Sequence, residues 1–156
     1  MSEATGMERL LAFASAPHLV HPSKDVVCWF TDPPGLVIQF ARATQGTRSM
    51  TEWLGHAAQD ALLARFPSHH HLVVVLDLSL MAGREPGARN GLVEPAKRIK
   101  SRVARTILLP PRTASRVYLG SMYAATALLS ACGIHVEISQ SLPKALAAHG
   151  LRAAPG

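Results

Sequence analysis

The sequence predicts an α/β fold, in which one mixed sheet of about five strands is covered by packed helices. The first observation is the apolar, β-branched run "LVVVLDL" at 72–78, which is typical of a strand buried on both faces of a sheet. The second is the alternation of strand-length apolar runs with segments of helical periodicity along the rest of the chain. Together they indicate strands joined by helical crossovers, so most of the sheet should be parallel or mixed.

The first part of the domain is expected to be a hairpin followed by a helix. Apolar runs at 26–30 and 36–40 flank "TDPPG", a turn-rich connection between two antiparallel strands. Ser49 and Glu52 then have capping-box spacing, and apolar residues follow them at helical intervals. These features predict a helix at about 50–66.

Beyond the glycine-rich loop at 83–91, the chain is expected to continue with alternating helices and strands. The residues Leu92, Ala96, Ile99 and Val103 form one apolar stripe, which predicts a second helix. The remaining expected elements are a strand at 105–109, a helix at 113–132, a strand at 134–138 and a short helix within 141–150.

Size and patterning predict a single domain at 25–150, with a tail at 151–156. We expect residues 1–24 to be a helical appendage and linker, whose helical face holds Met7, Leu10, Leu11 and Ala14. The chain shows neither a basic leader nor an apolar run of membrane length, so we expect a soluble, cytoplasmic protein.

Several motifs, taken in this order, resemble a known family. "LVVVLDLS", a loop and helix, "TILLP", another helix, "GIHVEIS" and a short Ala-rich helix resemble the STAS domain, whose SpoIIAA-like members are anti-sigma-factor antagonists. The STAS/SEC14-like variant is closer still, because "DLSLMAGREPGAR" is similar to its Asp, Gly and Pro-x-Ala-Arg pattern. The resemblance covers about 25–150 and implies a SpoIIAA/STAS-like fold that binds a partner protein.

The loop after the strand at 72–78 differs from the phosphorylated members of that family. In those members, a loop serine accepts phosphate from a partner kinase. Alignment of Asp77 and Ser79 with the family's strand end places Glu85 on the corresponding loop, and no Ser, Thr or Tyr lies between Ser79 and Ser101. A phosphoserine would bring about −2 charge, whereas this loop carries fixed charges. The resemblance therefore implies partner binding without the usual phosphoserine.

The candidate partner-binding loop consists of Asp77, Ser79, Arg84, Glu85 and Arg89. Asp77 could be catalytic, since α/β folds collect ligands at the carboxyl ends of strands, but an Asp there more often caps the following turn. The glycines and arginines of the loop are compatible with a small-anion site, a protein contact or a plain connection. We favour the protein contact, and no residue is predicted to be catalytic.

A basic patch follows the loop, and it consists of Lys97, Arg98, Lys100, Arg102 and Arg105. Arg98, Arg102 and Arg105 would share one helical face. Such a face is usually solvated, but it could also dock an acidic partner. With a net charge of +6, it leaves nucleic-acid or anionic-ligand binding as the alternative function, although only 5% of residues are aromatic and could stack on bases.

No metal site or cofactor is expected. The run His69, His70 and His71 lies before a strand and lacks the spacing of a tetrahedral zinc site. Cys28 and Cys132 lie in apolar surroundings and are interpreted as reduced core residues rather than nucleophiles.

The sequence therefore favours a non-enzymatic regulatory module that binds proteins. Its partner would be a regulatory kinase-like or sigma-factor-pathway protein, and a homodimer is a further option. Nucleic-acid or anionic-ligand binding through 97–105 is the alternative, and a small hydrolase or transferase ranks third.

Overall fold

The computed structural model describes residues 11–88, 91, 93–131 and 133–156. Its main feature is a seven-stranded mixed sheet in the order β1-β2-β3-β5-β7-β8, with β9 also paired to β2. The strands are β1 (Leu19–Val20), β2 (Val26–Asp32), β3 (Gly35–Phe40), β5 (Leu72–Asp77), β7 (Val103–Leu109), β8 (Val136–Ile138) and β9 (Arg152–Ala153). A separate two-stranded sheet joins β4 (Thr44–Gly46) to β6 (Met81–Arg84).

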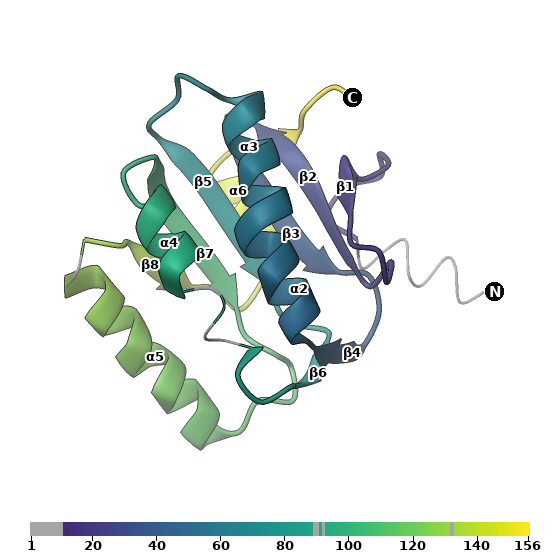
Figure 1. Cartoon of the computed structure of the whole chain (residues 1–156). Coiled ribbons are helices and arrows are strands. Elements are labelled where there is room, and N and C mark those ends of the chain that lie inside the picture. The colour runs from purple at the N-terminus through teal and green to yellow at the C-terminus, as the bar shows by residue number, and fades with distance from the viewer. Residues whose placement is uncertain (1–10, 89–90, 92, 132) are drawn as a thin grey trace.

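The direction of the strands decides where the helices lie. β2 and β3 form an antiparallel hairpin, whereas β3, β5, β7 and β8 run parallel and each lies one step further along the sheet. Right-handed crossovers that step in one direction place their helices on one face. The helices are α2 (Arg48–Trp53), the π-helical turn η1 (Leu54–Ala58), α3 (Gln59–Arg65), α4 (Val93–Ile99), α5 (Arg116–Ala131) and α6 (Leu142–Ala148). Figure 1 shows α2, α3 and α4 on the near face and α6 behind the sheet.

The core has two layers because successive side chains of a strand point to opposite faces of the sheet. On the face covered by α2 and α3, Cys28 and Phe30 pack with Leu62. On the other face, Trp29 packs with Ala145 of α6 and with the segment Leu11–Phe13. The central strands are thus buried on both faces.

The coarse prediction of an α/β fold with a mixed sheet is confirmed. All five predicted strands are present, and β5 lies inside the sheet, as its apolar sequence predicts. The helix predicted at about 50–66 is present from Arg48 to Arg65, interrupted by η1. No helix in the described part of the chain is long and apolar enough to cross a bilayer.

The second predicted helix is wrong at its end. Its apolar stripe extends to Val103, but α4 ends at Ile99 and Val103 is the first residue of β7. Arg102 donates its backbone N–H to the carbonyl of Ile99, and Leu72 donates its own to the carbonyl of Arg102. Pairing with β5 therefore takes these residues into the sheet, where Val103 is half-buried against the core.

The sheet also extends beyond the expected limits at residues 25 and 150. β1 and β9 both lie on the outer edge of β2, because β3 occupies its other edge. Within the expected helical appendage, the described residues 11–18 are not helical, and Met7 and Leu10 lie outside the described residues. Short edge strands of this kind carry little periodicity from which to predict them.

The pairing of β3 with β5 depends on a residue without a side chain. A Cβ added at Gly35 would collide with the carbonyl of Val73 and lie 2.9 Å from the Thr31 hydroxyl. We expect Gly35→Ala to lower the free energy of unfolding by roughly 3 kcal/mol, because the clash is with backbone that cannot turn away. Urea unfolding measures this. Gly120→Ala in α5, where a Cβ meets nothing within 4 Å, should instead leave stability unchanged or raise it. Equal effects of the two substitutions would contradict the expectation.

Candidate functional site

A cleft lies at the carboxyl ends of three parallel strands. It has a volume of about 490 Å³, and Asp77 of β5, Leu109 of β7 and Ser139 after β8 contribute to its floor and walls. The first residues of α6 and the segment Leu11–Ala12 also line it. Open α/β sheets collect ligands at this edge, so its polar groups are the first candidates for a site.

Asp77 is buried and fully engaged by its neighbours. The residue is only 3% exposed. One carboxylate oxygen accepts a hydrogen bond from the Gln39 amide (3.1 Å), and the other accepts the backbone N–H of Ser79 (2.9 Å). Gln39 lies opposite Asp77 in the β3–β5 register and accepts the N–H of Ala12 (2.8 Å). The carboxylate thus fixes the strand end and the following turn, as the capping interpretation expects.

The loop after β5 is fastened to the segment before α2. β6 pairs in parallel with β4, and Glu85 donates its N–H to the carbonyl of Gly46 (2.7 Å). The Glu85 carboxylate accepts the backbone N–H of Arg48 (2.7 Å), and the Arg48 guanidinium donates to the carbonyl of Pro86 (3.0 Å). Gly87 has a φ of +79°, and a Cβ there would meet the Arg48 guanidinium. Backbone and side-chain hydrogen bonds therefore attach residues 84–86 to the segment before α2.

A cation–π contact connects the same loop to α5. The guanidinium carbon of Arg84 lies 5.3 Å from the centre of the Tyr118 ring. Arg112, which precedes α5, donates its N–H to the carbonyl of Ser79 (3.1 Å). Between them lies a shallow depression of about 270 Å³. Loop and helix therefore form one continuous surface.

Helix α5 carries exposed apolar side chains, of which Val117 directly precedes Tyr118 in the chain. Val117 is 81% exposed and Tyr123 is 54% exposed, although both are large and apolar or aromatic. Figure 1 shows α5 at the edge of the molecule, apart from α2 and α3, and it packs chiefly against β8. The helix predicted at 113–132 is present as α5, but the sequence pattern did not identify Val117 and Tyr123 as exposed. The available signal was that apolar residues occur on more than one face of this helix.

Four of the five residues of the predicted partner-binding loop lie in this region. Asp77 and Ser79 line the cleft, while Arg84 and Glu85 lie at the end of β6 and after it. Arg89 lies outside the described residues.

The predicted basic patch is not one helical face, because α4 ends before most of it. Lys97 and Arg98 are in α4, Lys100 and Arg102 lie in the following turn, and Arg105 is in β7. Their sequence spacing was therefore a poor guide to their positions.

Most of these cations also have protein partners. Lys97 pairs with Glu94 (3.3 Å), and the Arg98 guanidinium donates to the carbonyl of Gly55 (2.8 Å). The Arg102 guanidinium donates to the carbonyls of Phe66 (2.6 Å) and His69 (2.5 Å). The Arg98 bond thus connects α4 to η1, and the Arg102 bonds connect the turn after α4 to the loop before β5.

Arg105 belongs to a small charged cluster at the β8 edge. It pairs with Glu137 (2.9 Å), whose other carboxylate oxygen lies 3.1 Å from His149 Nε2. Partial burial acts to raise the pKa of Glu137, but the hydrogen bonds and charges of His149 and Arg105 outweigh it and lower that pKa. The positive charge of Arg105 is thus paired with a carboxylate on the neighbouring strand β8.

The remaining candidates are the histidine run before β5 and the two cysteines. The His69 ring packs edge-on against Phe66 at 5.5 Å, and no metal-binding cluster of His, Cys, Asp or Glu occurs among the described residues. Cys28 is buried in the core, and burial raises the pKa of its thiol well above the ordinary value. A thiolate at Cys28 is therefore strongly disfavoured. Cys132 lies outside the described residues.

Comparison with known proteins adds no assignment: no family model, no curated protein and no solved structure matches the chain.

The engagement of Asp77 can be tested by exchanging its hydrogen-bond roles with those of Gln39. Asp77→Asn should cost about 1–3 kcal/mol of unfolding free energy, because the new amide brings a donor against the Gln39 donor. The double variant Asp77→Asn with Gln39→Glu should recover much of that loss, since the new carboxylate can accept from both the new amide and the Ala12 N–H. Asp60→Asn, on the exposed side of α3, is the matched control and should have little effect. Additive losses in the double variant would contradict this account.

Proposed function

We propose that the protein is a non-enzymatic regulatory module that binds another protein through the β6–α5 surface. This surface consists of Arg84, Arg112, Arg116, Val117 and Tyr118. The observation that carries the proposal is the combination of a fastened loop with an exposed apolar helix. Loops held in one conformation lose little entropy on binding, and exposed apolar side chains supply the area that a partner can bury.

The charges of this surface indicate the chemistry of the partner. Arg84, Arg112 and Arg116 are all exposed, and the whole chain carries a net charge of +6. Arginine and tyrosine are frequent at the energetic centres of protein interfaces. The fitting partner is therefore a protein with an apolar patch surrounded by Asp and Glu.

Regulation in this proposal does not depend on a loop phosphoserine. The described part of the loop, 79–88, contains Ser79 as its only hydroxyl side chain, and the Ser79 backbone is tied to Asp77 and Arg112. The resemblance to SpoIIAA-like anti-sigma-factor antagonists supports a regulatory role. A kinase-like or sigma-factor-pathway protein is accordingly the kind of partner we propose, bound constitutively.

Two observations make the alternatives weaker. Asp77, the sharpest catalytic candidate, already accepts hydrogen bonds at both oxygens, which favours a structural role over acid–base chemistry. The basic residues that suggested nucleic-acid binding lie on different elements, and Arg98, Arg102 and Arg105 bond to protein groups. Nucleic acid is retained as an outcome of the test.

The test is affinity capture from extracts of the native cell after nuclease treatment, followed by titration calorimetry with the protein recovered. Val117→Asp and Arg84→Glu should each weaken binding at least about tenfold, since they introduce a buried or repulsive charge into the interface. Neither should shift the thermal midpoint appreciably, because both side chains are exposed.

Matched controls lie elsewhere on the surface. Val20→Asp on β1 changes another exposed apolar residue, and Lys144→Glu on α6 reverses another exposed cation. Both should bind as the wild type does. Equal binding by all four variants, or capture that disappears with nuclease treatment, would overturn the proposal.

A further inference from the structure

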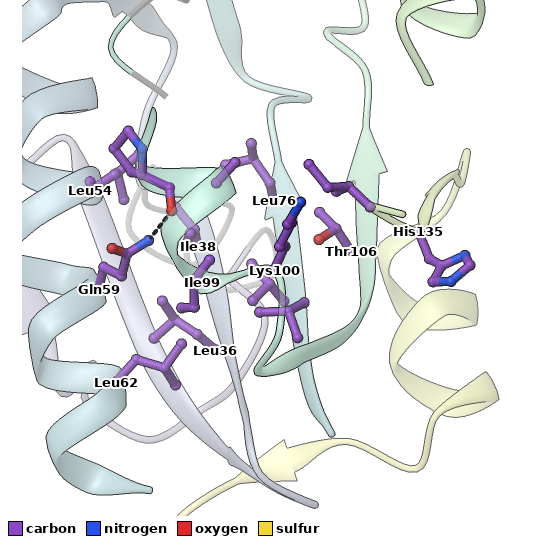
Figure 2. Close-up of a pocket in the computed structure, with 16 residues that line it drawn as sticks. Leu36, Ile38, Leu54, Gln59, Leu62, Leu76, Ile99, Lys100, Thr106 and His135 are labelled. Carbon is purple, nitrogen blue, oxygen red and sulfur yellow. Dashed lines mark hydrogen bonds between the residues drawn. The ribbon is translucent and has the colours of Figure 1, made fainter. Parts of the chain in front are cut away.

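A separate cavity lies within the core layer beneath α4. It has a volume of about 180 Å³ and is lined almost entirely by aliphatic side chains (Figure 2). Ile38 and Leu76 contribute from the sheet, whereas Leu54, Leu62 and Ile99 contribute from the helices. Packed interiors rarely contain voids larger than a water molecule, so a cavity of this size needs a reason.

The helical layer above the cavity is locally reshaped. Leu54 and Gly55 line the cavity and begin the π-helical turn η1, a type of irregularity that is frequent at functional sites. Pro95 of α4 packs so closely on Gly55 that a Cβ there would lie 2.5 Å from its ring. The Gln59 amide donates to the Pro95 carbonyl (2.8 Å), as Figure 2 shows. These contacts hold α4 by its first turn, and the cavity extends toward its last.

The far end of the cavity carries a cation and reaches solvent. Lys100 and His135 are exposed residues that line this cavity. Thr106 of β7 also lines it. In Figure 2 the amino group of Lys100 lies toward Leu76 and Thr106. Of the described residues that line the cavity, none is Asp or Glu. The cavity is thus apolar inside and positive at its opening.

We propose that this cavity binds a small apolar carboxylate, with the hydrocarbon under α4 and the carboxylate at Lys100. Apolar cavities of about 150 Å³ accept molecules of the size of benzene, so 180 Å³ suits a chain or ring of about six carbons. The Lys100 ammonium and the Thr106 hydroxyl are donors suited to a carboxylate. This site is separate from the β6–α5 surface, and the inference does not depend on the proposed protein partner.

Hexanoate and hexanol are the probes, because they share a chain and differ in charge. Methyl-labelled wild-type protein titrated with hexanoate should show shifts at Leu62 and Ile99, whereas Leu109 on the other face of the sheet should not respond. Hexanol should bind at least about fivefold more weakly. Lys100→Met should weaken hexanoate binding by about the same factor and leave hexanol binding unchanged, since the aliphatic stem is kept.

Two further variants complete the test. Lys97→Met, in α4 one turn before Lys100 and paired with Glu94, should bind hexanoate as the wild type does. Ala96→Leu should fill the cavity and abolish binding of both probes, with a thermal midpoint that is unchanged or higher. The methyl titration of the wild type stands independently if that variant fails to fold. Absence of hexanoate binding at millimolar concentration, equal affinity for hexanol, or no effect of Lys100→Met would overturn the proposal.

Discussion

The hydrogen bonds of Asp77 connect more of this structure than any other polar interaction described above. Through Gln39 they join the end of β5 to β3 and to the N-terminal segment at Ala12, and through Ser79 they set the turn that leaves the sheet. A buried carboxylate is costly unless its oxygens accept hydrogen bonds, so the native position of Asp77 requires all of these groups at once. Asp77, Ser79 and Ala12, which these bonds connect, also line the cleft at the carboxyl ends of the strands.

The turn at Asp77 and Ser79 sets the direction in which the following loop leaves the sheet. After Ser79 the chain forms β6 beside β4, and the Glu85–Arg48 contact closes the loop against the start of α2. Arg84 then lies over Tyr118, so the loop reaches α5 in a defined orientation. In the proposed function, this arrangement of charged and apolar groups is the surface that the partner contacts, and the Asp77 carboxylate serves the fold.

The sequence predicted what depends on local periodicity and missed what depends on distant partners. β5 was predictable because strands buried on both faces are continuously apolar, and the α2–α3 helix because its apolar residues recur at helical spacing. Val103 satisfied the helical stripe equally well, and only its pairing opposite Leu72 decides that it begins β7. Arg84 was expected in a loop but ends strand β6, because it pairs with Gly46 of β4. The contacts of Arg84 with Tyr118 and of Glu85 with Arg48 join residues 34 and 37 positions apart and leave no local pattern.

The central claim is that the loop after β5 is a preformed surface in the free protein. Amide hydrogen exchange of the unliganded chain tests it most directly, through the amide of Glu85, bonded to Gly46, and that of Ser79, bonded to Asp77. The account predicts protection of both amides that approaches that of β5, because their bonds open only with the surrounding structure. Exchange of both at the rate of an unstructured peptide would contradict it.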